Sequence, residues 1–338
     1  MSADTIRIAT FNTELQRKGP GLLLRDIARG EDPQIAAVVE VIVRVAPDIL
    51  LLQGIDYDLD GKALAALAGA IGTQGHPMPH HFSARPNTGL QTGLDLDGDG
   101  LTGGPRDAQG YGLFSGHGGM AILSRFPILA EEARDFSAML WRDMPDALRV
   151  TVNGAPFPSA EAEKIQRLSS VAHWVVPVRL PGGDRVHLLA FHATPPVFDG
   201  PEDRNGLRNH DEILFWKHFL DGAFGAPPAQ PFVLLGDANN DVRGGEGLDP
   251  PLRALLTDPR LQDPMPRSVG SEAVTGDLYD TVDWPDPVPG NLRVSYVLPS
   301  SDLTVADQGV HWPEPGSDAA FEAEAASRHR LVWVDLKL

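Results

Sequence analysis

Polar residues of types that carry chemistry stand at the ends of short apolar segments in this sequence. They are Asn12, His192, Asp237, Asn239 and His329. Carboxylate and imidazole groups transfer protons, and together with amides they can bind a cation or hold an anionic ligand. Any one of them could instead serve a turn, and residues 236–239 alone are typical of a loop. Five such positions in one chain indicate a site, because ligands of α/β proteins bind where strands run out into loops.

The apolar segments that would position these residues have either strand-like or helical patterns. Short apolar runs predict strands at 6–11, 49–52, 120–124, 171–178, 186–191, 232–235, 292–298 and 331–336. A helix is predicted from Pro33 to Val45, because Asp32 provides an N-cap and apolar residues recur at helical spacing. Further helices are predicted at 62–71 and 205–220. This order favours one α/β domain over residues 1–338, with a long loop insertion at about 72–118.

The composition narrows the classes of function. The chain has 338 residues, with 28 Lys and Arg against 46 Asp and Glu, which gives a net charge of −18. This acidic balance argues against a nucleic acid as partner, because phosphate backbones bind basic faces. The absence of Cys excludes disulfides, thiolate metal sites and thiol nucleophiles. No apolar run approaches the ~20 residues that cross a membrane, and no signal peptide is recognisable. We therefore expect a soluble chain, whose compartment and oligomeric state stay open.

Seven short motifs occur along the chain in an order that matches a known family. They are Thr10-Phe11-Asn12, Asp48-Ile49-Leu50-Leu51-Leu52-Gln53, Met120-Ala121-Ile122-Leu123-Ser124-Arg125, Phe191-His192-Ala193-Thr194, Gly236-Asp237-Ala238-Asn239, Arg293-Val294-Ser295-Tyr296-Val297-Leu298 and Ser327-Arg328-His329. In this order the chain resembles the endonuclease/exonuclease/phosphatase family, whose fold is similar to that of deoxyribonuclease I. The resemblance runs from residue 5 to the last residue. It implies a four-layer α-β-β-α sandwich, in which two mixed β-sheets pack together and helices lie outside.

The resemblance also implies a role for each of the polar residues. Asn12 matches an Asn that helps to hold Mg²⁺ and the phosphate, and Asn239 matches a second phosphate-binding Asn. His192 matches a His that steadies the phosphoryl oxygens. Asp237 matches an Asp that orients or deprotonates the attacking water, with metal binding as a further role, and His329 matches a His that supports in-line displacement. These parts imply phosphoryl transfer assisted by Mg²⁺ or Mn²⁺, which stabilises charge on the phosphoryl oxygens.

The sequence departs from the family pattern at three acidic positions. The family has a metal-binding Glu where this chain has Gly54, an Asp that pairs with the catalytic His where it has Ser295, and an Asp where it has Arg328. In one reading, a nearby acid such as Asp56 or Asp58 substitutes, and a phosphoester hydrolase keeps weak or reorganised metal-dependent activity. In the other, Arg328 replaces the cation, and the cleft binds a small anionic or phosphorylated ligand without hydrolysing it. If the three losses weaken hydrolysis, restoring the three carboxylates should raise it.

Two features of the predicted long loop add further candidates. Asp95, Asp97 and Asp99 alternate ahead of Gly100, as at the start of a Ca²⁺ loop. The twelfth position is Arg106 where an EF-hand has Glu, so an acidic solvated turn is the alternative. His117 precedes the strand predicted at 120–124, and the resemblance suggests that it lines the phosphate or substrate site.

Overall fold

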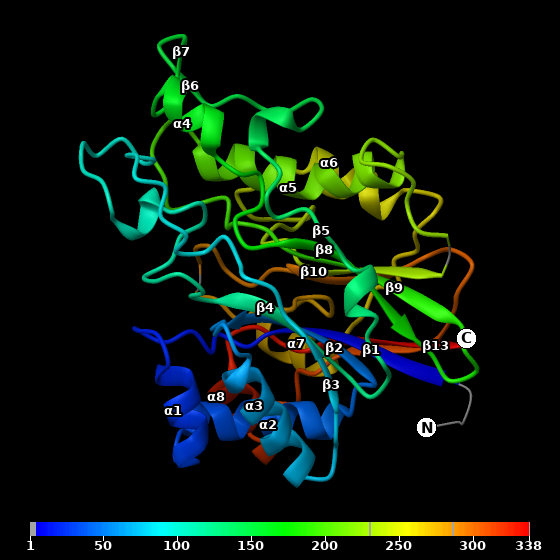
Figure 1. The fold of residues 1–338 in the computed structure, drawn as a ribbon. Coiled ribbons are helices and arrows are strands. Elements are labelled where there is room, and N and C mark those ends of the chain that lie inside the picture. The colour runs from blue at the N-terminus through cyan, green and yellow to red at the C-terminus, as the bar shows by residue number, and fades with distance from the viewer. Residues whose placement is uncertain (1–4, 230, 286, 338) are drawn as a thin grey trace.

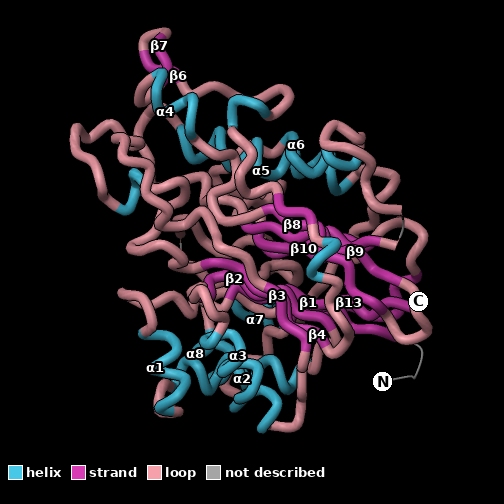
Figure 2. Tube along the Cα trace, viewed as in Figure 1, coloured by secondary structure: helices cyan, strands magenta, loops and turns pink. Residues whose placement is uncertain are grey.

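The computed structural model, which describes residues 5–229, 231–285 and 287–337, places two β-sheets face to face between two layers of helices (Figures 1 and 2). The first sheet has the order β12-β13-β1-β2-β4-β3 and the second has the order β11-β10-β9-β8-β5. Each sheet mixes parallel and antiparallel pairs. The four-layer sandwich expected from the resemblance is therefore confirmed.

The strands of the first sheet are β1 (Thr5–Asn12), β2 (Ile49–Ile55), β3 (His80–Phe82), β4 (Gly119–Ser124), β12 (Thr304–Val310) and β13 (Val332–Lys337). Those of the second are β5 (Arg134–Asp135), β8 (His173–Arg179), β9 (Arg185–His192), β10 (Phe232–Asp237) and β11 (Ser295–Pro299). A separate hairpin joins β6 (Thr151–Val152) to β7 (Ala155–Pro156).

Helices cover the outer face of each sheet. The first sheet is covered by α1 (Leu22–Arg29), α2 (Pro33–Val45), α3 (Lys62–Thr73) and α8 (Asp318–Ala326), and the second by α5 (Arg204–Leu220) and α6 (Pro250–Leu256). Two short helices, α4 (Ala160–Ile165) and α7 (Val269–Thr275), and three 3₁₀ turns at Pro105–Asp107, Ala130–Glu132 and Trp141–Asp143 complete the elements. No helix in the described ranges is long and apolar enough to cross a membrane.

The strand alternation decides which side chains enter the central core. In β2, Leu50 and Leu52 pack under the outer helices, while Ile49 and Leu51 pack between the two sheets. The same period of two holds in the strands that end at the predicted site. The inner residues are Ile6 and Ile8 of β1, Leu188 and Ala190 of β9, Val233 and Leu235 of β10, and Val297 of β11. Continued to the strand ends, this alternation turns Asn12, His192, Asp237 and Ser295 toward the space between the sheets.

The strand register then brings these ends to the same edge of the sandwich. Asn12 of β1 pairs with Gln53 of the parallel strand β2. Across the sandwich, Asp237 of β10 pairs with His192 of the parallel strand β9 and with Ser295 of the antiparallel strand β11. The fold therefore converges several of the predicted polar residues at one place.

The long loop predicted at about 72–118 is more ordered than the sequence suggested. Helix α3 reaches Thr73, and β3 adds an edge strand to the first sheet by pairing with β4. The later residues form isolated bridges, such as Thr88 with Gly110. β3 was not expected, because three residues are too few to show a period.

Candidate active site

The strand ends open into a cleft of about 380 Å³. Of the predicted site residues, the ones that line it are Asn12, His117, His192, Asn239, Arg328 and His329. Asp237 lies directly beneath, fully buried, and contacts two of the lining side chains. One cleft thus brings together the candidates for catalysis and for phosphate binding.

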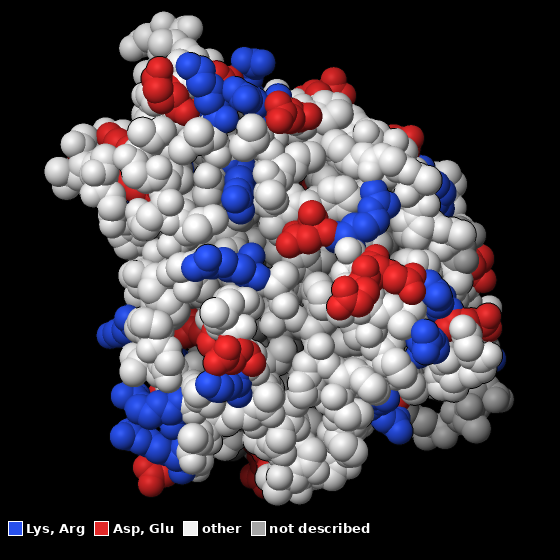
Figure 3. Space-filling model, viewed as in Figure 1, with Lys and Arg blue, Asp and Glu red and all other residues white. Residues whose placement is uncertain are grey.

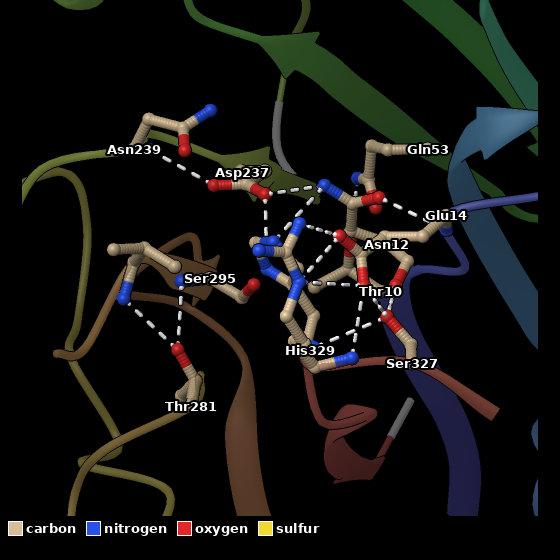
Figure 4. A network of polar contacts seen from close by, with 12 residues as sticks. Thr10, Asn12, Glu14, Gln53, Asp237, Asn239, Thr281, Ser295, Ser327 and His329 are labelled. Atoms are coloured by element: carbon tan, nitrogen blue, oxygen red, sulfur yellow. Dashed lines mark hydrogen bonds and ion pairs between the residues drawn. The ribbon is translucent and has the colours of Figure 1, made fainter. Parts of the chain in front are cut away.

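Asn12, Asp237 and His329 form the centre of the cleft, where their side chains converge (Figure 4). The Asn12 Nδ2 group donates a 2.9 Å hydrogen bond to Asp237 Oδ2 and lies 3.5 Å from His329 Nε2. His329 Nδ1 lies 3.3 Å from the same Asp237 oxygen, at an angle that makes it an electrostatic contact and not a hydrogen bond. A neutral His329 with its proton on Nδ1 satisfies both contacts. The amide and the imidazole therefore share one carboxylate oxygen.

The loop after β10 holds the other oxygen of Asp237. The Asn239 backbone N–H donates to Asp237 Oδ1 at 2.9 Å, and the Asn239 side chain donates to the carbonyl of Ala193 at 2.9 Å. Asn239 has a left-handed backbone, with φ of 48°, which Asn tolerates better than most residues. The turn thus fixes both the carboxylate and a second amide at the cleft.

Burial favours the neutral form of the two cleft histidines that lie near Asp237. Burial lowers the pKa of His192, although the nearby negative charge of Asp237 opposes this. Burial also lowers the pKa of His329, again opposed by Asp237. His192 Nδ1 has no hydrogen-bond partner among the described residues. Both imidazoles are therefore able to accept a proton.

Ser295 lies at the position where the resemblance implies a carboxylate partner for His329. It is 1% exposed, and its Oγ has no hydrogen-bond partner within the described ranges. Its backbone N–H donates to Thr281 Oγ1 at 3.1 Å. The edge of Trp284 packs against the His329 ring, with 5.6 Å between centroids. His329 is thus held by packing and by Asp237, with a hydroxyl at the position expected for a second acid.

Gly54 occupies a position that cannot accept a side chain without displacing the site. Its backbone is left-handed, with φ of 66°, where glycine is strongly favoured. A Cβ atom there would lie 2.6 Å from Asn12 Oδ1, 3.0 Å from the Glu14 backbone nitrogen and 3.2 Å from Gln16 Oε1. Two amide oxygens therefore approach Gly54, at the position where the resemblance implies a Glu.

Glu14 is a cleft residue that the sequence reasoning missed. It lines the cleft together with Gln16, and its backbone is left-handed, with φ of 49°. The sequence carries no signal for it, because β1 ends at Asn12 and a left-handed turn, not strand alternation, places Glu14. The structure therefore contains a carboxylate near Gly54 that the family motifs do not supply.

Arg328 binds Glu14 through its main chain and its side chain. The Arg328 backbone N–H donates to Glu14 Oε2 at 2.9 Å and its Nε donates to Oε1 at 2.9 Å, while an Nη2 contact completes the ion pair. The Ser327 hydroxyl lies 3.1 Å from Glu14 Oε2 and 2.8 Å from the Asn12 carbonyl oxygen, so these two acceptors share its single proton. Burial alone would raise the pKa of Glu14, but the hydrogen bonds from Arg328 and the positive charges nearby lower it. Glu14 is therefore ionised and paired.

The remaining acidic candidates lie outside the cleft lining. Asp56 accepts backbone N–H bonds from Gly118 and Arg17, and burial raises its pKa to about 6. Asp95, Asp97 and Asp99 place carboxylate oxygens within 4.8 Å of one another. Each of the three also accepts backbone N–H groups of its own loop. The structure does not bring these acids to the cleft, and Ca²⁺ in their loop stays a prediction.

The cleft residues fit a hard divalent ion by the chemistry of their donors. Because Asn12 Nδ2 donates to Asp237, Asn12 Oδ1 faces Gly54 instead, where Gln16 Oε1 also approaches. The Glu14 carboxylate lines the same cleft. All three side chains therefore offer oxygen donors, the kind that Mg²⁺ and Mn²⁺ take. When bound, such an ion neutralises charge on a phosphoryl group and lowers the pKa of a bound water.

The arrangement can bind a phosphoryl group and direct a water at it. Amide groups of Asn12 and Asn239, the guanidinium of Arg328 and the His192 imidazole surround the cleft floor. Such donors stabilise the charge that develops on phosphoryl oxygens. Asp237 and the neutral imidazoles provide acceptors for the proton of an attacking water.

Comparison with known proteins gives one family and a set of similar folds. A model of the endonuclease/exonuclease/phosphatase family matches residues 9–329. Comparison with curated proteins finds no match. An endonuclease/exonuclease/phosphatase from Beutenbergia cavernae is 19% identical with a TM-score of 0.59, over 99% of this chain and 72% of that one.

Two further solved structures have the same fold at low identity. Sphingomyelinase C from Streptomyces griseocarneus is 18% identical with a TM-score of 0.51, over 98% of this chain and 99% of that one. The human Nocturnin catalytic domain with bound sulfate anion is 14% identical with a TM-score of 0.51, over 98% of this chain and 93% of that one. At these identities the likeness concerns the fold alone.

Proposed function

Because the chain belongs to the endonuclease/exonuclease/phosphatase family, we propose that it is a phosphoester hydrolase acting on a small phosphorylated molecule or a phosphodiester. Members of this family are phosphodiesterases, phosphatases and nucleases, and they generally depend on divalent metal ions. The observation that carries the proposal is the convergence of Asn12, Asp237 and His329 below one cleft, with His192 beside them.

The roles follow from the contacts of each side chain. Arg328 and the amides of Asn12 and Asn239 bind the phosphoryl oxygens, and His192 donates or accepts a hydrogen bond there. Asp237 orients the attacking water and receives its proton, and it also holds the ring of His329. With a Ser at position 295, Asp237 is the carboxylate that must contact both the attacking water and the His329 ring. We therefore expect slower turnover than in a site with a second carboxylate at that position.

The cleft supports a small substrate with an apolar part. Aromatic side chains of Tyr111, Phe198 and Trp284 line it, and Arg328 is its single lining Lys or Arg within the described residues. On the face shown in Figure 3, Lys and Arg interleave with Asp and Glu and do not gather into one basic surface. A polynucleotide would need several phosphate contacts in a row, so it is a poorer candidate.

A second candidate function is binding without hydrolysis. It is favoured by the Glu14–Arg328 ion pair, which neutralises the one cleft carboxylate near Gly54 and leaves a guanidinium at the mouth. In this reading, the cleft takes a small anionic ligand through Arg328 and the amides. The two candidates differ only in whether the bound ester is cleaved.

The test is hydrolysis of bis-p-nitrophenyl phosphate and p-nitrophenyl phosphate with Mg²⁺, Mn²⁺, Ca²⁺ or a chelator. We expect turnover that falls at least ~10²-fold in Asp237→Ala and in His192→Ala. His80→Ala, in the edge strand β3 outside the cleft lining, is the matched control and should keep full activity. Turnover that survives both cleft substitutions would contradict the proposal. No turnover by the wild-type protein, together with calorimetric binding of phenylphosphonate that Arg328→Gln weakens, would establish the binding function instead.

A further inference from the structure

The missing family carboxylate has a geometric replacement in this chain. A side chain at Gly54 would displace Asn12, because a Cβ would lie 2.6 Å from Asn12 Oδ1. The space beside it is approached by two uncharged oxygens, Asn12 Oδ1 and Gln16 Oε1. Neutral oxygens alone bind a divalent ion weakly, so a site here needs an anionic ligand as well.

Glu14 is the candidate for that anionic ligand. Ser327 Oγ lies 3.1 Å from Glu14 Oε2 and 2.8 Å from the Asn12 carbonyl oxygen, so the carboxylate lies beside Asn12. Its backbone nitrogen lies 3.0 Å from the position of the hypothetical Cβ at Gly54, and its side chain lines the same cleft as Asn12 and Gln16. Its φ of 49° is costly for a residue other than Gly, Asn or Asp, and such strain clusters at functional sites. This left-handed turn directs the charged side chain of Glu14 into the cleft.

The Arg328 side chain that binds this carboxylate is largely exposed to solvent. The Arg328 side chain is 60% exposed, whereas that of Glu14 is 17% exposed. The guanidinium can therefore turn toward an anion in the cleft, while the Arg328 backbone N–H still donates to Glu14 Oε2 at 2.9 Å. An arriving phosphate competes for the guanidinium, because Arg binds phosphate and carboxylate with the same fork of donors.

We propose that Glu14, with Asn12 and Gln16, forms a divalent-cation site that replaces the family carboxylate missing at Gly54. Arg328 blocks this site until an anionic ligand draws its guanidinium away. The proposal rests on the proposed function only in that a phosphoester substrate would be the natural anion. The proposal predicts that cation and anion bind cooperatively. Both are favoured when the Arg328 guanidinium leaves Glu14, because this frees the carboxylate for the cation and the guanidinium for the anion.

The test measures Mn²⁺ binding by electron paramagnetic resonance in the absence of any ester. Glu14→Gln should weaken Mn²⁺ binding at least about tenfold, because it removes the anionic ligand. Arg328→Gln should strengthen it at least about tenfold, because it removes the competing cation. Sulfate should strengthen Mn²⁺ binding to the wild-type protein and have no effect in Arg328→Gln.

A matched ion pair separates these effects from general stability. Arg44 of α2 and Glu322 of α8 form a 2.6 Å salt bridge outside the cleft lining, so Arg44→Gln and Glu322→Gln should leave Mn²⁺ affinity unchanged. Melting temperatures of all variants confirm folding. If Glu14→Gln folds, binds Mn²⁺ as the wild type does and Arg328→Gln gains nothing, the proposed site is wrong.

The site and the hydrolase function can fail separately. Opposite changes of Mn²⁺ affinity in the two variants, without ester hydrolysis by the wild type, would support the cation site and overturn the hydrolase proposal. Ester hydrolysis that depends on Asp237, with Mn²⁺ binding unaffected by Glu14→Gln, would overturn the cation site and leave the hydrolase proposal standing.

Discussion

Substituting Gly54 by Ala tests the packing that sets this cleft apart. The new methyl group would lie 2.6 Å from Asn12 Oδ1 and 3.0 Å from the Glu14 backbone nitrogen. Asn12 is 6% exposed and tied to Asp237, so it cannot turn aside without giving up that hydrogen bond. The substitution should therefore lower both the stability of the fold and the activity of the cleft.

The magnitude follows from two separate costs. A Cβ in the left-handed region costs about 1–2 kcal/mol, and forcing a methyl group into a packed site costs about 1–3 kcal/mol more. Gly61, with φ of 64° and no atom within 4 Å of its hypothetical Cβ, should carry only the first cost. For 338 residues at about 2.1 cal/mol/K each, 1 kcal/mol shifts the melting temperature by about 1.4 °C.

Differential scanning fluorimetry of the two alanine variants measures the difference. We expect Gly61→Ala to melt about 1–3 °C below the wild type and Gly54→Ala about 3–7 °C below it, from the costs above. Gly61→Ala should keep full ester hydrolysis, whereas Gly54→Ala should lose most of it. Equal melting temperatures and equal activities would show that Asn12 does not pack against Gly54 as described. The same collision predicts that Gly54→Glu disrupts the cleft and does not restore it.

Three further predictions concern the rest of the molecule. Phe198 lines the cleft and is 76% exposed. In steady-state assays, Phe198→Ala should raise KM for aryl phosphates about threefold or more and change kcat little. The control Phe321→Ala, on α8, should change neither constant. A changed kcat with constant KM would contradict this role. Burial lowers the pKa of His173 from 6.5 to about 4, so only the unfolded chain is protonated between these values. As the pH falls through this window, the stability advantage of wild type over His173→Gln in urea unfolding should shrink by about 3 kcal/mol, and a constant difference would refute the burial argument. Ca²⁺ should raise the melting temperature through residues 95–99, and a melting temperature that neither Ca²⁺ nor a chelator changes would remove the case for an ion there.

Local patterns were sufficient to predict most of the fold. The strand predicted at 6–11 and the helix predicted from Pro33 became β1 and α2, with Asp32 accepting the N-cap bonds from Gln34 and Ile35. Strand β12 was missed, because it lies at the edge of the sheet, where only two of its seven residues, Gly309 and Val310, are buried. Helix α8 was missed because its many alanines give only a weak apolar stripe.

The site was predicted where it depends on strand ends and missed where it depends on backbone shape. Asn12 and Asp237 follow directly from alternation and register. Glu14 reaches the cleft through a left-handed turn that no apolar pattern signals. Asp56 was considered as a substitute acid because of its spacing from Gly54, but backbone N–H groups hold both of its oxygens. The contacts around Gly54 are thus the part of the site that the sequence predicts least well.

The antiparallel pairing of β1 with β13 has a consequence for how this protein is made. Thr5 pairs with Lys337, and Asn12 and His329 come from the two distant chain segments that this pairing joins. During synthesis, the edge of β1 that pairs with β13 stays unpaired until β13 has left the ribosome. Closing a loop of this length is slow, and it comes late among the steps of folding. Ligand binding in the cleft therefore reports that the first sheet has closed, because Asn12 and His329 come together where β1 and β13 pair.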